Sequence, residues 1–173
     1  EILVDHPMHT TLLNNAAIFA RQLNKKAVAL AYAERLISLN PNDVRGYRIA
    51  AAVHVDNESP SEVISVANAG LAVSSQDPNL LYLLGLAYIF DGQPQNAILK
   101  LQEAQLHGSR ASDIPLWLAI STERSGDIDA AIILYEKAAQ KMTGDLRPWV
   151  FAGLMLVKAE RCEDARPFLI NAA

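Results

Sequence analysis

Apolar residues between positions 79 and 104 recur at the spacing expected of two short amphipathic helices. Between the two helices, Gly92 can adopt the left-handed conformation that ends a helix, and Pro94 suits the first turn of the next one. The apolar positions are Leu81, Leu84, Gly85 and Tyr88 on the first helix, and Ala97, Leu101 and Ala104 on the second. The stretch therefore predicts a helical hairpin, in which small residues let the two backbones come close together.

The same pattern returns every 34 residues along the whole chain. Three columns of residues spaced in this way are dominated by small side chains and stay in phase with no insertion. The first holds Ala17, Ala51, Gly85, Ala119 and Gly153; the second holds Ala29, Val63, Ala97, Ala131 and Ala165; the third holds Leu36, Gly70, Ala104, Ala138 and Ala172. We interpret Ala17, Ala51, Gly85, Ala119, Gly153, Ala97, Ala131 and Ala165 as repeat-packing positions, and the chain as five stacked helix pairs.

The boundaries of the units follow from residues that favour the start of a helix. We expect units at 10–43, 44–77, 78–111, 112–145 and 146–173, with helices near 10–23 and 26–39 in the first unit and 44–57 and 60–74 in the second. The expected starting residues are Asp43, Asp77, Ser112 or Asp113, and Asp145. Residues 1–9 resemble the tail of a preceding unit, because Pro7 lies 34 positions before Pro41.

A period of 34 with two helices per unit is similar to the tetratricopeptide repeat. The third unit carries the most complete version, with Leu84-Gly85 and Tyr88 on the first helix and Ala97 and Ala104 on the second. The resemblance implies an all-α fold, a right-handed superhelical solenoid of antiparallel helix pairs. It also implies a concave groove lined by the first helices, where members of the family bind other proteins.

Charge and composition exclude several classes of protein. The net charge of −4 argues against a surface that binds nucleic acid without regard to sequence. Cys162 is the single cysteine, which excludes an internal disulfide. No apolar run reaches the roughly 18–20 residues of a membrane span, so we expect no membrane insertion of this segment. A cytoplasmic and a bacterial periplasmic location both remain open.

The sequence carries no recognisable catalytic or metal-binding motif. Phosphate-binding loops, HExxH, CxxC and GxSxG patterns are all missing. His6 and His9 have the spacing of metal ligands without a third partner, and Cys162 stands at a predicted helix start. We therefore predict a protein that is not an enzyme and that needs no cofactor and no metal.

Candidate groove residues come from the columns that should face the concave side. They are Asn14, Arg45, Arg48, Tyr82, Leu86, Ile89, Leu116, Ile120 and Val150. Two interpretations stay open: the apolar members pack neighbouring first helices together, or they form an exposed strip that marks a partner site. In the second, Tyr82, Leu116 and Val150 would be exposed, and Arg45 and Arg48 would meet the acidic end of the ligand.

The function predicted from these residues is a protein–protein interaction scaffold, part of a larger assembly protein, that binds a peptide or an amphipathic helix in its groove. One alternative is a structural segment that self-associates through its uncapped ends. Another is a regulatory array attached to a catalytic or membrane domain outside this chain.

Overall fold

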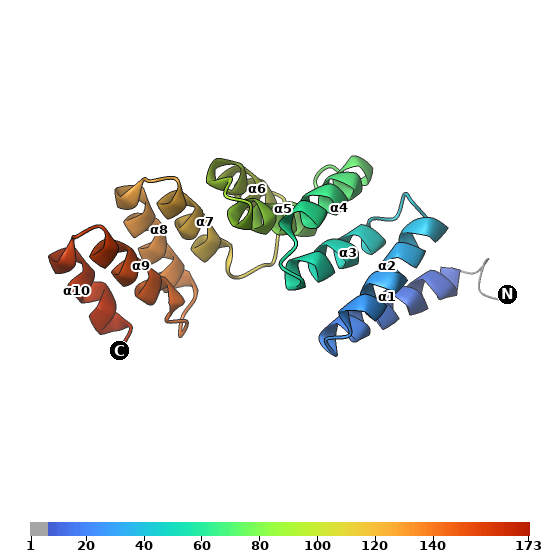
Figure 1. The fold of residues 1–173 in the computed structure, drawn as a ribbon, viewed down its shortest axis with the longest axis horizontal. Helices are drawn as coiled ribbons and strands as arrows, with labels where there is room; N and C mark the ends of the chain where they lie inside the picture. Colours follow the sequence, from blue (N-terminus) through green and yellow to red (C-terminus); the bar gives the residue numbers. More distant parts are fainter. Residues whose placement is uncertain (1–6) are drawn as a thin grey trace.

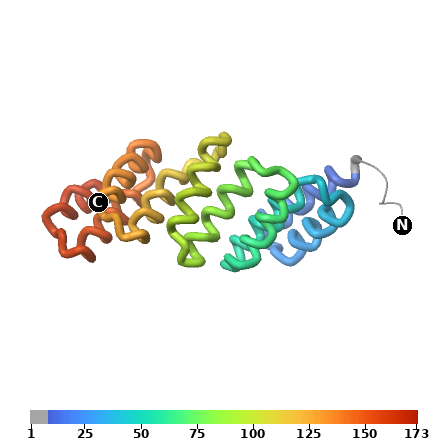
Figure 2. Tube along the Cα trace, turned by 90° about the horizontal axis from the view of Figure 1, so that it is seen from above, coloured from blue at the N-terminus to red at the C-terminus, as the bar shows by residue number. Residues whose placement is uncertain are grey.

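The computed structural model describes residues 7–173, which fold as an elongated array of antiparallel helix pairs. The pairs follow one another along the long axis (Figure 1), and successive helices run back and forth across it (Figure 2). Within the described residues the helices are α1 (Pro7–Gln22), α2 (Lys26–Leu39), α3 (Val44–Asp56), α4 (Pro60–Val73), α5 (Pro78–Phe90), α6 (Pro94–Leu106), α7 (Ile114–Arg124), α8 (Ile128–Lys141), α9 (Arg147–Lys158) and α10 (Cys162–Asn171). The prediction of an all-α solenoid of helix pairs is confirmed.

The start of the chain differs from expectation. Helix α1 begins at Pro7, three positions before the predicted start at residue 10. The remainder of the predicted tail, residues 1–6, lies outside the described part of the chain.

The turn inside each helix pair repeats the same backbone conformation. Positions 34 residues apart have positive φ in every unit: Asn24 (57°), Glu58 (55°), Gly92 (72°), Gly126 (93°) and Glu160 (60°). In the third unit, the amide of Gln93 donates to the carbonyl of Tyr88 at 2.8 Å, which closes the last turn of α5. The left-handed turn at Gly92 is therefore as predicted. Asparagine or glutamate tolerates the same conformation in other units at some cost in energy.

Carboxylate side chains cap α3 and α5, and a third carboxylate accepts from the first amide of α9. Asp43 accepts from the amide of Arg45 at 3.0 Å, and Asp77 accepts from the amide of Leu80 at 3.0 Å. Asp145 accepts from the amide of Arg147 at 2.9 Å. These three residues were predicted to start helices, because a short acceptor side chain satisfies amides that have no partner inside the helix.

Close backbone approach holds each pair together. Ala17, Ala51, Ala97, Ala119 and Ala131 have no exposed surface, Ala165 is 1% exposed, and Gly85 and Gly153 are buried. A Cβ atom added to Gly85 would lie 2.8 Å from Cγ of Leu101, inside the contact distance of two carbon atoms. The small column therefore sets how near the second helix of a pair can come to the first.

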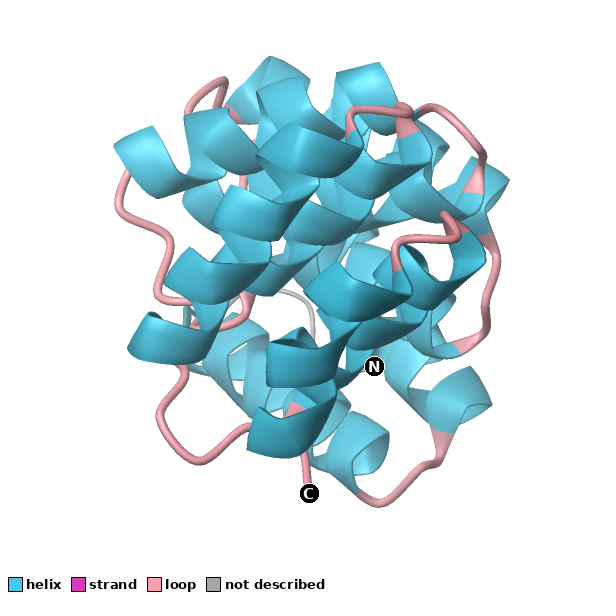
Figure 3. Cartoon of the chain, turned by 90° about the vertical axis from the view of Figure 1, so that its left-hand side faces the viewer, coloured by secondary structure: helices cyan, strands magenta, loops and turns pink. Residues whose placement is uncertain are grey.

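Neighbouring pairs join through the second helix of one unit and the first helix of the next. The first helices also touch one another directly, α1 with α3, α3 with α5, and α5 with α7, most extensively between α3 and α5. Helices on the inside of a curve lie closer together, so the odd-numbered helices line the inner side of the array. Figure 3, which looks along the array from the end where the chain finishes, shows the helices linked only by loops.

The first helix of the fourth unit begins later than the period predicts. Helix α7 begins at Ile114, although α5 begins at Pro78 and a strict period would place the start at residue 112. The connection from α6 occupies residues 107–113, and α7 is only 11 residues long. The register of α7 is nevertheless kept, because Ala119 is as fully buried as Ala51. None of the described helices is long and apolar enough to cross a bilayer.

Candidate functional site

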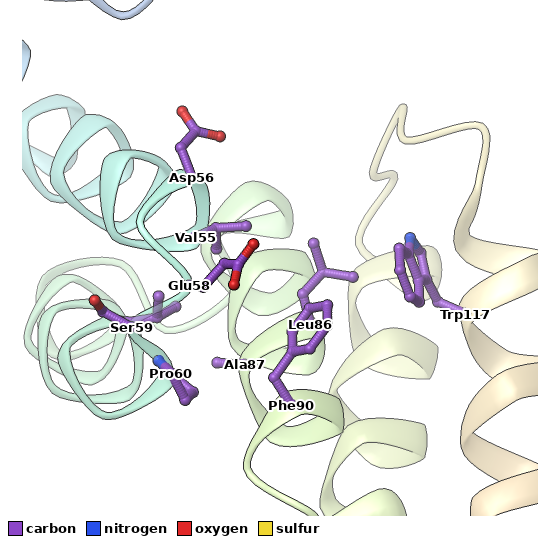
Figure 4. A pocket seen from close by; sticks show the side chains of 10 residues that line it. Val55, Asp56, Glu58, Ser59, Pro60, Leu86, Ala87, Phe90 and Trp117 are labelled. Atoms are coloured by element: carbon purple, nitrogen blue, oxygen red, sulfur yellow. The ribbon is translucent and has the colours of Figure 1, made fainter. Parts of the chain in front are cut away.

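Two pockets lie next to each other on the inner side of the array and share one wall. The first, here called the α3–α5 pocket, has a volume of about 610 Å³ and is lined by residues that include Val55, Asp56, Glu58, Leu86, Phe90 and Trp117 (Figure 4). The second, the α7–α9 pocket, has a volume of about 440 Å³ and is lined by residues that include Trp117, Ile120, Phe151, Leu154, Arg124 and Lys158. Phe90 and Trp117 line both, so the two pockets form one groove.

The shared wall is an aromatic pair. The ring centroids of Phe90 and Trp117 lie 6.1 Å apart at an interplanar angle of 66°, the edge-to-face arrangement that aromatic rings favour. Phe90 stands in the last turn of α5 and is 58% exposed, although it is a large apolar side chain. Figure 4 shows Leu86 and Phe90 on the side of α5 that faces Trp117.

Asp113 fixes the orientation of Trp117. The indole Nε1 donates to the Asp113 carboxylate at 2.9 Å, and the hydroxyl of Tyr82 donates to the same carboxylate at 3.0 Å. Burial, and then the charge of Asp113, raises the pKa of Tyr82 above its ordinary value, which keeps the hydroxyl protonated as a donor. Asp113 stands at the start of α7, as predicted, but its side chain makes no capping bond to the helix amides and supports the aromatic wall instead.

The rim of the groove carries charged groups at both ends. At the α7–α9 pocket, Nη1 of Arg124 donates to the carbonyl of Ile89 at 2.6 Å, and Lys158 stands exposed in the last turn of α9. Glu123, also at this pocket, accepts from the hydroxyl of Tyr135 at 2.5 Å. Burial, followed by the bond to Glu123, raises the pKa of Tyr135, so this hydroxyl also remains a donor.

At the α3–α5 pocket the charges are largely paired. Asp56 accepts from Nε of Arg21 at 2.5 Å and from Nη2 at 3.0 Å, and Lys26 donates to the backbone carbonyl of Asp56. Glu58 is exposed in the turn between α3 and α4.

Of the two interpretations left open by the sequence, the structure favours packing over exposure for three residues of the apolar strip. Leu86 is 6% exposed, Leu116 is 1% exposed and Ile89 is not exposed at all. Leu116 belongs to the core that α7 shares with α8, α9 and α10. Ile89 packs in the core between α5 and α7. For these residues the packing interpretation holds, although the edge of Leu86 still borders the α3–α5 pocket.

The remaining apolar candidates are half-buried. Ile120 lines the α7–α9 pocket, whereas Tyr82 and Val150 are not among the residues that line either pocket.

The two predicted arginines bond within the chain. Arg45 donates to Asp43 through Nε at 2.8 Å, and this hydrogen bond lowers the pKa of Asp43 and raises that of Arg45. Arg48 donates through Nε to Asp77 at 2.8 Å, and the Asp77 side chain is almost fully buried. Both arginines therefore bind carboxylates at helix starts, and that they meet the acidic end of a ligand stays a prediction. Asn14 donates to its neighbour Asn15 at 3.3 Å.

Three aromatic residues that line the groove were not predicted from the sequence: Phe90, Trp117 and Phe151. The sequence pointed to Phe90 at the position directly after Ile89, the last candidate groove residue on its helix. The column through Phe90 holds Gln22, Asp56, Phe90, Arg124 and Lys158, and each of these residues lines a pocket on the inner side. Adjacent positions on a helix differ by about 100°, so columns one residue apart present different faces.

The described residues contain no group of three His, Cys, Asp or Glu side chains placed to hold a metal ion. Cys162 is exposed. The arrangement is that of an apolar contact surface with a charged rim.

A solenoid of helix pairs that repeats every 34 residues defines the class of this protein. Residues 10–43 match the family model of the tetratricopeptide repeat, and the chain as a whole has the fold of tetratricopeptide-repeat solenoids. No curated protein matches its sequence.

Three solved structures illustrate the likeness in fold. The MamA protein is 21% identical with a TM-score of 0.80, over 94% of this chain and 89% of its own. YrrB, described as a TPR protein with an unusual peptide-binding site, is 22% identical with a TM-score of 0.75, over 92% and 82%. PilF of Pseudomonas aeruginosa is 14% identical with a TM-score of 0.80, over 94% and 74%.

Proposed function

We propose that this chain is an interaction scaffold that binds a peptide or an amphipathic helix of another protein along the groove, with Phe90 and Trp117 at its centre. The tetratricopeptide-repeat fold supports a role in protein–protein interaction in general. The observation that supports the groove in particular is the aromatic pair of exposed Phe90 and half-buried Trp117 between two apolar pockets. Aromatic residues beside pockets supply much of the binding energy at protein interfaces.

The size of the two pockets suits side chains of a partner. Volumes of about 610 and 440 Å³ fall in the range of cavities that take up bulky apolar groups. A segment laid across the aromatic wall would place one apolar anchor on each side of it. YrrB, a structure of the same fold, is described as having an unusual peptide-binding site, which is consistent with this mode. Tetratricopeptide-repeat proteins are generally non-catalytic scaffolds, and the proposal needs no catalytic group.

The test compares partner capture by matched variants. Phe90→Ala/Trp117→Ala should abolish capture of partners from an extract while the helical circular dichroism signal is kept. The control, Leu99→Ala/Leu106→Ala, removes apolar side chains that are 56% and 80% exposed on α6, outside the groove. Capture that survives in the first variant, or falls equally in the control, would refute the groove as the binding site.

Self-association is the second candidate function, and one observation favours it. Leu12 and Phe19 on α1 are 62% and 60% exposed, although their equivalents in later units are buried against the preceding second helix. Those equivalents include Leu80 (0%), Val53 (0%) and Ala87 (2%). A second copy could dock its α10 on this face, because Leu169 and Ile170 of α10 are also exposed.

Sedimentation velocity over a range of concentrations separates the two candidates. Self-association predicts a sedimentation coefficient that rises with concentration and a loss of this rise in Leu12→Glu/Phe19→Glu. A concentration-independent monomer would exclude it and leave the scaffold proposal intact.

A further inference from the structure

The groove is electrostatically uneven along its length. At the α7–α9 pocket, Arg124 and Lys158 bring two positive charges, and Glu123 brings one negative charge. The Glu123 carboxylate already accepts the hydroxyl of Tyr135. No carboxylate in the described residues lies within salt-bridge distance of either cation. This end of the groove therefore has a local excess of positive charge on a chain whose net charge is −4.

Arg124 is held in a position to receive a carboxylate. Its Nη1 is fixed by the carbonyl of Ile89 at 2.6 Å, next to Phe90 in the last turn of α5. The structure shows no bond from the other guanidinium nitrogens to a described residue, and these nitrogens form the remaining part of the planar fork. A guanidinium that is already oriented loses less conformational entropy when it binds a carboxylate.

The opposite end of the groove does not share this excess. Asp56 and Glu58 bring two negative charges there, while Arg21 and Lys26 stand beside Asp56. Glu58, exposed at the edge of the pocket, would repel an acidic residue placed at that end. A charged ligand can therefore distinguish the two ends.

We infer that the partner segment is an acidic amphipathic one, whose apolar side chains cover Phe90 and Trp117 and whose Asp or Glu residues lie beside Arg124 and Lys158. The inference rests on the proposed function and adds the charge and the direction of the ligand. Complementary charges at the rim set the orientation of a bound segment and raise its association rate, and salt weakens them.

The test is a selection of random 16-residue peptides displayed on phage against the immobilised full chain. Peptides retained by the wild type should combine two apolar anchors with an excess of Asp and Glu on one side of them. A synthetic peptide of the enriched sequence should bind Lys158→Glu about tenfold more weakly, measured by fluorescence anisotropy. Arg124→Gln should weaken it as well, and selection against Lys158→Glu should lose the acidic excess.

Matched charge changes outside the groove provide the control. Lys137→Glu on α8 and Arg166→Glu on α10 alter exposed cations that line neither pocket, and they should leave peptide affinity unchanged. Circular dichroism verifies that each variant is folded.

The possible results distinguish a failure of the charge inference from a failure of the proposed function. The enriched peptides could need Phe90 and Trp117 but show no acidic excess, or bind Lys158→Glu as tightly as the wild type. Either result would overturn the charge inference, while the groove would remain the proposed binding site. Enrichment that is unaffected by Phe90→Ala/Trp117→Ala, or no enrichment at all, would overturn the proposed function as well.

Discussion

The ion pair between Arg48 and Asp77 should be a measurable part of the stability of the array. Asp77 is 2% exposed, and its carboxylate caps α5 through the amides of Asn79 at 3.1 Å and Leu80 at 3.0 Å while it accepts from Arg48. Loss of a helix cap costs about 1 kcal/mol. Loss of the bond to Arg48, a residue with a side chain 37% exposed, adds about 1–2 kcal/mol. Asp77→Ala should therefore cost about 2–3 kcal/mol.

Thermal unfolding followed by circular dichroism measures this cost. At about 2–4 °C per kcal/mol for a chain of this size, the midpoint should fall by about 4–12 °C in Asp77→Ala. Arg48→Ala should lower it less, because two backbone amides still bind the carboxylate. In the double variant the midpoint should fall by less than the sum of the decreases in the two single variants, since both substitutions remove the same contact.

The control is Arg147→Ala, which breaks a more exposed pair with Asp145 and should have a smaller effect than Arg48→Ala. An unchanged midpoint in Arg48→Ala, or strict additivity in the double variant, would refute a structural role for Arg48.

Four further substitutions test the fold and the aromatic wall. Gly85→Leu should overpack its helix pair and lower the free energy of unfolding by about 1–3 kcal/mol in urea denaturation, and an unchanged midpoint would contradict the close approach. Positions 126 and 160 both have positive φ, which favours glycine. In the same denaturation assay, Glu160→Gly should therefore stabilise the chain by about 0.5–1 kcal/mol, and Gly126→Ala should destabilise it by about 1–2 kcal/mol. Equal effects of the two substitutions would contradict a turn conformation shared by the units. Asp113→Ala should release the indole of Trp117 and shift its fluorescence emission to longer wavelength, and an unchanged spectrum would show that the carboxylate does not hold the ring.

The regular part of the fold could be predicted because small residues and helix caps act locally and recur with the period. Gly85 and Gly153 mark close approaches that only small residues allow, and Asp43 and Asp77 cap helices that follow directly in sequence. These interactions could therefore be predicted without knowing the curvature of the array.

The inner surface could not be predicted in the same way, because exposure depends on how neighbouring units are offset. Leu116 belongs to the same 34-residue column as Tyr82, yet Leu116 is 1% exposed whereas Tyr82 is half-buried. The ion pair of Arg48 could not be predicted either, since its partner Asp77 lies 29 positions away and the pairing is visible only in three dimensions.

Photo-crosslinking tests most directly whether a partner occupies the groove. Benzoylphenylalanine would be introduced in place of Phe90 in one sample and of Leu106 in another, since both positions are exposed but only Phe90 lines the groove. After irradiation with a peptide selected on the wild-type chain, mass spectrometry should find the crosslink at position 90 and not at position 106. A crosslink of equal yield at position 106, or none at position 90, would contradict the assignment of the groove as the binding surface.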